Sequence, residues 1–220
     1  MSDPGPSDEA LLAAHLRGDR RAFATLVSRH ERRVYGLCLR LLGNREDAED
    51  ATQEAFLAAL RHAAGFRHTA AFSTWLYRIA VNAATDQARR RARVRSVPLV
   101  EEGPGLPVAP AVPDAAEGMA DTLAVQAALT RVPLEFRVAL VLCDLYQLPT
   151  AQAAEILGVP VGTVKSRAFR GRLALAALLA ESEEGRGPER AKATAPLTGT
   201  GPAAATSEPR EPQRHRPDQE

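Results

Sequence analysis

The chain has 220 residues, of which 45% are hydrophobic, and its formal net charge is +1. This length and composition allow one or two small domains with ordinary cores. Aromatic residues make up only 5% while leucine and alanine are abundant, which favours helices over sheets. A net charge near zero argues against a general nucleic-acid coat, but the charges are segregated along the chain and leave room for locally basic faces.

The sequence contains no apolar run long enough to span a bilayer, and its start, Met1 to Pro4, lacks the basic and apolar parts of a secretion signal. We therefore expect a cytoplasmic protein without direct membrane insertion. The two cysteines, Cys38 and Cys143, lie in apolar helical patterns with no His or Cys at ligand spacing. The sequence thus predicts small core residues there, and no disulfide or metal site.

Three helices are predicted after a flexible start over residues 1–7. They begin at the capping residues Ser7, Asp19 and Asn44. The second has a long apolar stripe that includes His30, which we interpret as a packing residue rather than a ligand or a base. In the third, Asp47 occupies the capping-box position.

The third helix presents an acidic face with an apolar residue beside it. Asp50 and Glu54 lie with Gln53 on this face, close to Leu57. Such a surface suits a protein partner with a basic coiled surface, although a merely soluble acidic helix is the alternative. Its carboxylates do not indicate catalysis, because no His, Cys or Ser constellation surrounds them.

Aromatic and basic residues gather on the helix predicted to follow the loop at residues 65–71. Its inward stripe begins at Phe72. Rings outside such a stripe can stack on unpaired bases while arginines follow the backbone, which predicts a site for a single nucleic-acid strand. Taken alone, Trp75 would be a core residue. The predicted site comprises Trp75, Tyr77, Arg78, Asn82, Arg89 and Arg90.

Residues 96–117 are rich in Pro and Gly and are predicted to form a flexible linker. A second helical domain follows over residues 118–182, and within it the segment 150–178 predicts a helix-turn-helix. Thr150 caps its first helix, Gly158 ends that helix, and the second helix begins near Val161. After it, residues 183–220 are predicted to be disordered.

The second helix of this motif has one buried stripe and one basic face. The stripe includes Val164, Ala168 and Gly171 at helical spacing. The basic face suits the DNA major groove, where Arg can read guanine and Lys neutralises phosphate; a solvated basic helix is the alternative. The face comprises Thr163, Ser166, Arg167 and Arg170, and Lys165 and Arg172 flank it.

Four segments in fixed order resemble the bacterial sigma-70 family of RNA polymerase sigma factors, and within it the small extracytoplasmic-function (ECF) group. They are DAEDATQEAF, WLYRIAVNAATDQARRR, LTRVPLEFRVALVL and EILGVPVGTVKSRAFRGR. Each alone is weakly specific, but the ordered set around a proline-rich linker is strongly specific and covers most of residues 8–182. The segment AAHLRGDRRAF also resembles actinobacterial members of the M type.

The resemblance implies an all-α fold with two small helical domains, region 2 over residues 8–95 and region 4 over 118–182. It implies that region 2 binds the clamp coiled coil of the largest subunit of core RNA polymerase. Region 2 would also engage the minus-ten promoter element, where a base is flipped out at a cost of a few kcal/mol. The residues implied for core binding are Asp47, Asp50, Gln53, Glu54 and Leu57. For the minus-ten element the resemblance adds Phe66 and Arg67 to the predicted strand-binding residues.

Region 4 would read the minus-thirty-five element with the basic face of the helix-turn-helix. The implied partners are core polymerase, promoter DNA and an anti-sigma factor, with no small-molecule substrate, cofactor or metal. Ala168 and Gly171 are slimmer than is usual in the family, which predicts either closer or looser packing of that helix.

One alternative is a stand-alone helix-turn-helix regulator whose first domain is a sensor or a dimerisation module. The acidic face and the aromatic segment distinguish the two hypotheses, because only a sigma factor needs both. An enzyme is disfavoured, since the sequence has no phosphate-binding loop, no nucleophile beside a base and no ligand cluster.

Overall fold

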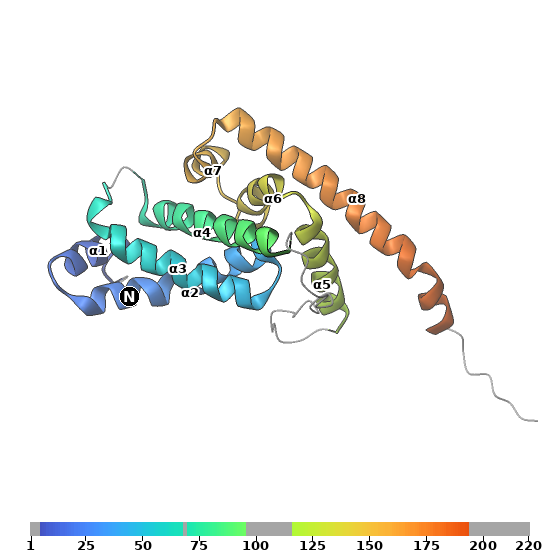
Figure 1. Cartoon of the computed structure of the whole chain (residues 1–220), viewed down its shortest axis with the longest axis horizontal. Helices are drawn as coiled ribbons and strands as arrows, with labels where there is room; N and C mark the ends of the chain where they lie inside the picture. The colour runs from blue at the N-terminus through green and yellow to red at the C-terminus, as the bar shows by residue number, and fades with distance from the viewer. Residues whose placement is uncertain (1–4, 68–69, 96–115, 194–220) are drawn as a thin grey trace, which may run out of the picture. The chain divides into compact units, whose positions relative to one another are not determined.

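The computed structural model describes residues 5–67, 70–95 and 116–193, with side chains over 5–67, 70–93 and 122–182. Every regular element in these ranges is helical, which confirms the predicted all-α class (Figure 1). The helices are α1 (Asp8–Leu16), α2 (Arg20–Leu42), α3 (Arg45–His62), η1 (Ala63–Gly65), α4 (Phe72–Arg95), α5 (Ala116–Arg131), α6 (Leu134–Leu140), the π-helical turn η2 (Val141–Leu145), α7 (Thr150–Leu157) and α8 (Val161–Ala193).

The predicted caps of the first three helices are confirmed. In each case a side-chain oxygen before the helix accepts a hydrogen bond from a backbone N–H of the first turn. The bonds run from Ala10 N–H to Ser7 Oγ (3.2 Å), from Arg21 N–H to Asp19 Oδ1 (2.9 Å) and from Asp47 N–H to Asn44 Oδ1 (2.8 Å). At the end of α2, Gly43 has a φ of 79°, in the left-handed region that glycine adopts without strain.

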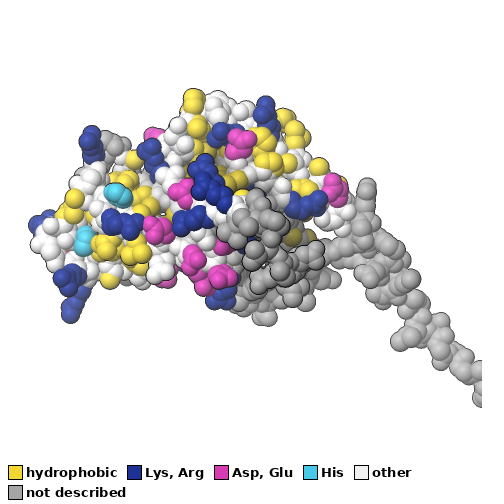
Figure 2. Space-filling model, in the orientation of Figure 1, with side chains coloured by type: hydrophobic (Ala, Val, Ile, Leu, Met, Phe, Trp, Pro, Cys, Tyr) yellow, Lys and Arg dark blue, Asp and Glu magenta, His cyan; other side chains and the backbone are white. Residues whose placement is uncertain are grey.

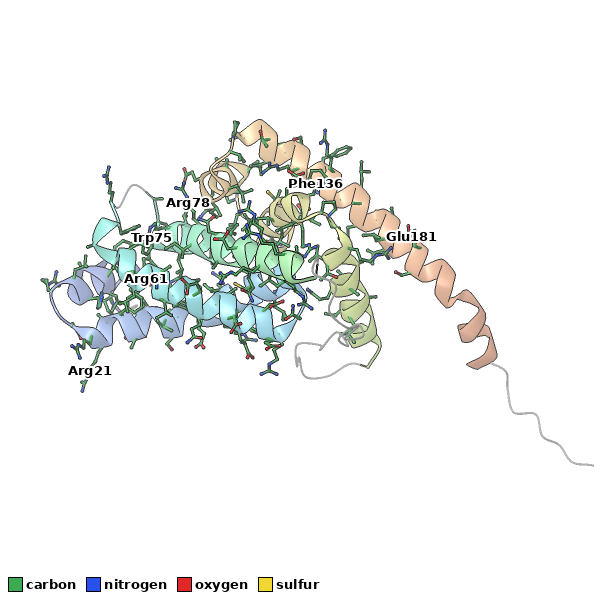
Figure 3. All side chains as sticks on the ribbon, in the orientation of Figure 1. Arg21, Arg61, Trp75, Arg78, Phe136 and Glu181 are labelled. Atoms are coloured by element: carbon green, nitrogen blue, oxygen red, sulfur yellow. The ribbon has the colours of Figure 1, made fainter. Side chains whose placement is uncertain are left out.

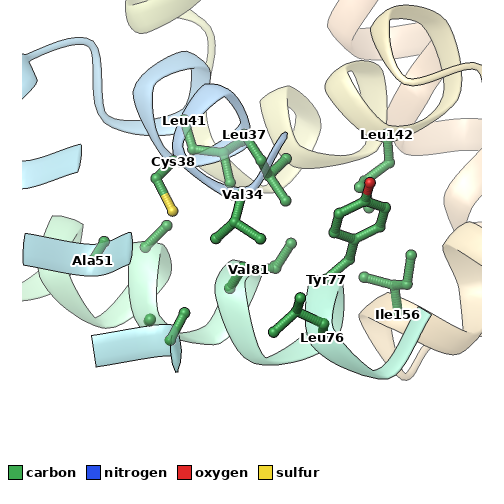
Figure 4. Close-up of a cluster of buried hydrophobic side chains, with 14 of the residues drawn as sticks. Val34, Leu37, Cys38, Leu41, Ala51, Leu76, Tyr77, Val81, Leu142 and Ile156 are labelled. Carbon is green, nitrogen blue, oxygen red and sulfur yellow. The ribbon is translucent and has the colours of Figure 1, made fainter. Parts of the chain in front are cut away.

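Small residues on α3 allow it to pack closely against α2 and α4, and the three helices lie side by side (Figure 1). The inward face of α3 consists of Ala48, Ala51, Ala55 and Ala59, all buried. Larger side chains fill the space around them (Figure 4), among them Val34, Leu37, Leu41 and Leu76. Cys38 also lies here as a small core residue, as predicted, and burial raises the pKa of its thiol to about 11.

The second half contains the predicted helix-turn-helix, formed by α7 and the start of α8. Gly158 ends α7 with a φ of 63°, as predicted. The predicted cap at Thr150 is wrong: Thr150 is the first helical residue, and Pro149 precedes it with no side-chain cap bond. Proline's fixed φ suits the entry to a helix, so the helix begins there without that cap.

The two halves share one hydrophobic core, and the described residues up to Gly185 form a single compact unit. The rings of Tyr77 and Tyr146 meet edge to face with centroids 5.8 Å apart. The Tyr146 hydroxyl donates to Arg33 O at 2.7 Å, and the side chain of Gln152 donates to that of Thr74 at 2.7 Å. The two predicted helical domains are therefore packed together rather than simply tethered.

Two predicted boundaries differ from the structure. Residues 96–115 of the predicted linker lie outside the described residues, and α5 begins at Ala116, within the predicted linker. At the other end α8 continues to Ala193, so the prediction of disorder from residue 183 is wrong for 183–193. Helix propensity does not explain this extension, because residues 183–193 include Gly185, Gly187 and Pro188, which are poor helix formers. The rest of the predicted tail lies outside the described residues.

Candidate protein-binding and nucleic-acid-binding surfaces

A groove of about 1420 Å³ is lined by residues of α2, α3 and α5. Tyr35, Leu39 and Phe56 contribute apolar surface to it. At its edge on α3, Leu57 and Leu60 are 44% and 41% exposed and lie one turn apart on the same side of the helix. The groove thus combines an apolar lining with exposed apolar edges, as a docked amphipathic helix requires.

Most of the predicted core-binding residues lie at this groove or beside it on α3. Gln53 and Leu57 line it, and Asp50 is exposed on the same helix. Glu54 forms an ion pair with Arg61 at 2.6 Å on the surface of α3. Asp50 and Glu54 thus lie beside the groove rather than in its lining, where Glu49 of α3 pairs with Arg45 at 2.7 Å.

Asp47 differs from the other residues predicted to bind core polymerase, because it connects α3 to α4. Its carboxylate accepts hydrogen bonds from Asn44 (2.5 Å), from Gln87 (2.9 Å) and from Arg91, and its side chain is only 15% exposed. Burial alone would raise the pKa of Asp47, but these hydrogen bonds and the charge of Arg91 together lower it. The structure therefore places Asp47 in a structural role, which its capping-box position had indicated.

The sequence analysis missed the α2 side of the groove. Val27, Glu31, Tyr35 and Leu39 recur every four residues there and all line the groove. They form a second row beside the buried stripe of α2. Val27, Tyr35 and Leu39 in this row make the apolar face of α2 broader than one core contact requires, and that breadth is the signal in the sequence.

An aromatic cluster lies at the start of α4. The ring centroid of Trp75 is 5.2 Å from that of Phe66 and 5.6 Å from that of Phe72. Phe72 is buried, whereas Phe66 and Trp75 are half-buried and Arg67 beside them is exposed. The cluster therefore presents part of two aromatic rings at the surface next to a cation, as the strand-binding prediction requires.

Farther along α4 the predicted strand-binding residues separate into buried and exposed positions. Tyr77 is 3% exposed and packed against Tyr146; burial raises the pKa of its hydroxyl although Arg33 opposes the shift. Arg78 is exposed on α4 and reaches toward the turn of the helix-turn-helix (Figure 3), where its Nη2 lies 3.7 Å from the position of a Cβ on Gly158. Asn82, Arg89 and Arg90 are also exposed.

The buried stripe of α8 is confirmed, and its small residues bring the helix close to α6. Val164 and Ala168 are buried. A Cβ on Gly171 would lie 2.9 Å from the backbone oxygen of Phe136, so the two backbones approach more closely than any other residue would permit. The sequence allowed either closer or looser packing of this helix at Ala168 and Gly171, and the structure shows the closer packing.

The opposite face of α8 carries the predicted basic residues, several of which have partners in the same half. Arg167 pairs with Glu135 at 3.2 Å, and Arg172 donates two hydrogen bonds to Asp144 at 2.7 and 2.8 Å. Arg170 lies over the ring of Phe136. Lys165 and Ser166 are exposed, and Thr163 is half-buried. By helical spacing Thr163, Arg167 and Arg170 lie on one side of the buried stripe and Lys165 and Arg172 on the other, and acidic neighbours hold one arginine on each side.

The face shown in Figure 2 mixes basic and acidic side chains, with no single basic field. Among the residues that the structure describes, no three His, Cys, Asp or Glu side chains are grouped to hold a metal ion. A search of the same residues found no helix that is long and apolar enough to cross a membrane.

Two family models match the chain, one on each half. The model described as Sigma-70 region 2 matches residues 26–94, and that described as Sigma-70, region 4 matches residues 122–175. The chain is 44% identical over 173 residues to the ECF RNA polymerase sigma factor SigM of Mycobacterium tuberculosis, covering 79% of this chain and 85% of the relative. It is 36% identical to the ECF RNA polymerase sigma factor SigW of Bacillus subtilis, over 72% of this chain and 89% of that one.

Solved structures resemble the fold as well. The chain matches CnrH in complex with the cytosolic domain of CnrY with a TM-score of 0.59 and 26% identity, over 80% of this chain and 99% of that one. It matches the sigma factor RpoE of Bartonella quintana, in complex with the anti-sigma factor NepR, with a TM-score of 0.59 and 26% identity, over 72% and 96%.

Proposed function

The chain belongs to the ECF RNA polymerase sigma factors of the sigma-70 family, and from this premise we propose how its surfaces divide the work of promoter-specific transcription initiation. The first half binds core RNA polymerase and the minus-ten element, and the second half binds the minus-thirty-five element. The observation that carries this proposal is the presence, on one chain, of three features: an apolar groove beside acidic residues of α3, an aromatic and basic cluster at the start of α4, and a helix-turn-helix. A stand-alone regulator needs only the last of these, and the relatives do not favour it.

Core polymerase is the proposed occupant of the groove between α2 and α3. Its apolar lining suits the apolar face of a helix. The charged residues of the lining are mixed, with Glu31 and Glu49 beside Arg32, Arg40 and Arg45, and the negative charge comes from Asp50 and Glu54 on α3 beside the groove. A basic helical element of the polymerase is complementary to both features. An anti-sigma factor that occupied the same groove would exclude the polymerase, and complexes of related sigma factors with anti-sigma factors support such a partner.

Promoter opening is assigned to the start of α4. Phe66 and Trp75 can stack on an unpaired base, while Arg67, Arg78 and Asn82 can contact the strand that carries it. Arg89 and Arg90 extend the basic surface along the helix and suit the phosphate backbone.

Recognition of the upstream duplex is assigned to α8. Ser166 is exposed one turn before Arg170, and Lys165 is exposed elsewhere on the same helix. Arg167 and Arg172 are held in place by Glu135 and Asp144. Arginines that are already oriented lose less conformational freedom when they donate to base edges or phosphates. Thr163, one turn before Arg167, completes the proposed surface.

The protein is proposed to act without catalytic activity, cofactor or small-molecule substrate of its own. Its work is binding, and the chemistry of RNA synthesis belongs to the polymerase. Its place of action is accordingly the cytoplasm, where core polymerase meets promoter DNA.

Run-off transcription with purified core polymerase on a promoter library tests the function as a whole. We expect start-site selection that depends on both promoter elements and on their spacing. A folded chain, free of any inhibitor, that gives sigma-free polymerase no start-site selection would reject the proposal.

A charge reversal tests the groove separately. Asp50→Arg with Glu54→Arg replaces two acidic side chains beside the groove by basic ones, so we expect co-elution with core polymerase to be lost while the circular dichroism spectrum stays unchanged. The matched control, Asp86→Arg with Glu155→Arg, makes the same charge change on α4 and α7 and is expected to keep co-elution. Unchanged co-elution of the first variant would show that the polymerase binds elsewhere.

A further inference from the structure

The start of α4 receives its cap from α1, a helix that the proposed function does not use. Two alanines, Ala70 and Ala71, precede α4, and neither has a side chain that can accept a hydrogen bond. Instead, the backbone N–H of Phe72 donates to Glu9 Oε1 at 3.3 Å, from a residue 63 positions earlier in the sequence. One of the N–H groups that a helix start leaves without a partner within the helix is satisfied in this way.

The carboxylate of Glu9 stands at the start of two helices. It belongs to the first turn of α1 and accepts from the first residue of α4. Both helix starts carry partial positive charge, which favours an anion between them. The backbone N–H groups of Glu9 and Phe72 accordingly lower the pKa of this carboxyl.

The adjacent residue fixes α1 to α2, so that Glu9 projects from a rigid support. Asp8 accepts a hydrogen bond from Arg29 at 3.1 Å and lies 2.7 Å from His30 Nε2. The ring of His30 in turn contacts the ring of Phe72, with centroids 5.4 Å apart. Phe72 therefore contacts the joined helices α1 and α2 at two points: its backbone N–H donates to Glu9, and its ring packs against that of His30.

Phe72 is also the buried centre of the aromatic cluster. The rings of Phe66 and Trp75 both contact it, at centroid distances of 6.1 and 5.6 Å. A shift of Phe72 would thus move the two half-buried rings assigned to the unpaired base. In such sites a displacement of about 1 Å has large effects on binding and rate.

We propose that Glu9 is a positioning residue for minus-ten recognition: from α1 it caps α4 and thereby holds Phe72, Trp75 and Phe66 in the arrangement that receives the unpaired base. This proposal rests on the proposed function of α4. Asp8 and His30 are its support, and none of the three residues needs to touch DNA.

The test compares Glu9→Ala with Glu9→Gln, which retains an acceptor oxygen at the same reach. Trp75 is the only tryptophan of the chain, so its fluorescence reports the cluster directly. We expect Glu9→Ala to shift the Trp75 emission to longer wavelength and to increase its quenching by acrylamide, with an unchanged far-ultraviolet circular dichroism spectrum. Glu9→Gln is expected to restore most of the wild-type emission. Glu155→Ala, which removes an exposed carboxylate of α7, is the matched control.

Binding is measured with core polymerase and a single-stranded oligonucleotide that carries the minus-ten element selected by the wild-type protein. For Glu9→Ala we expect the preference for this oligonucleotide over a scrambled one to fall roughly threefold to tenfold, a range typical of the loss of one helix cap. Co-elution with core polymerase and binding of minus-thirty-five duplex are expected to stay unchanged. Wild-type preference in Glu9→Ala would overturn the positioning role, whether or not the emission shifts.

Should Glu9→Ala fail to fold, Glu9→Asp takes its place, because it keeps the charge but shortens the side chain by one methylene. Wild-type emission and preference in Glu9→Asp, which cannot reach Phe72 equally well, would overturn the proposal. A wild-type protein without any minus-ten preference would instead reject the assignment of α4 to promoter opening, and the positioning role with it.

Discussion

Individual carboxylates on α3 differ in role although they look alike in the sequence. Asp47 accepts hydrogen bonds from Asn44, Gln87 and Arg91, whereas Asp50 on the same helix is exposed. We expect Asp47→Asn to reduce the free energy of unfolding by about 1–3 kcal/mol near neutral pH, because the three donors lose a charged and largely buried acceptor. Urea denaturation measures this value, and Asp50→Asn is the control, with an expected change below about 0.5 kcal/mol.

The pH dependence of this difference follows from the lowered pKa of Asp47. A carboxyl with a lower pKa in the folded state stabilises the protein above its unfolded pKa of about 3.9, and this contribution is lost as the pH falls through the folded pKa. The gap between wild type and Asp47→Asn should therefore shrink below about pH 4. A gap that stays constant between about pH 5 and pH 3 would show that the charge of Asp47 does not contribute.

The sequence predicted three of the four side-chain helix caps correctly, and the one at Thr150 is wrong. The caps at Ser7, Asp19 and Asn44 follow from side chains within three positions of their partners. The sequence did not predict the cap at Phe72, because its acceptor, Glu9, lies on another helix and no local pattern marks such a pair. The same holds for Asp47, whose link to α4 depends on how two helices pack.

Among the helices, the crossing of α8 and α6 depends on one missing side chain. A Cβ at Gly171 would meet the backbone oxygen of Phe136 at 2.9 Å, and a backbone atom can move away only with its helix. We expect Gly171→Ala to lower the free energy of unfolding by about 1–3 kcal/mol and to weaken binding of minus-thirty-five duplex, because α8 is displaced. Chemical denaturation and a duplex-binding titration measure the two effects.

Gly162 provides the matched control on the same helix. A Cβ there would have no neighbour within 4 Å, so Gly162→Ala should leave stability unchanged or raise it by up to about 1 kcal/mol through helix propensity. Equal stability of the two variants would mean that α8 does not approach α6 as closely as the Gly171 position indicates.

Periodicity in the sequence predicted the helices and the buried stripe of α8. The distance between two helices depends on atoms of both, so the small side chains at Ala168 and Gly171 were compatible with either closer or looser packing.

For the molecule as a whole, the contact between its halves is the feature that the sequence did not predict. Composition marks residues 96–117 as a linker, which indicates that two parts exist but not whether they touch. The contact depends on pairs far apart in sequence, such as Tyr146 with Arg33 and Gln152 with Thr74. No spacing rule relates positions separated by such distances.

Removal of these pairs tests the contact. We expect Tyr146→Ala with Gln152→Ala to accelerate hydrogen exchange in α7, with a loss of opening free energy on the order of 2–4 kcal/mol, because a ring contact and two hydrogen bonds disappear. Exchange in α3, which is far from these side chains in the sequence and packs between α2 and α4, is expected to stay unchanged. Tyr146→Phe, which keeps the ring, should have an intermediate effect. Unaltered exchange in α7 would show that the two bonds do not hold it.

The position of Tyr77 under Tyr146 has a thermodynamic consequence for regulation. If Tyr77 contacts promoter bases, its ring cannot pack against Tyr146 at the same time. The equilibrium between these two contacts is then linked to the binding of every ligand that favours one of them. A factor that clasps the two halves then lowers the affinity for DNA by the same ratio by which DNA lowers the affinity for that factor. Such reciprocity would allow silencing by a partner that never covers a DNA-contacting side chain.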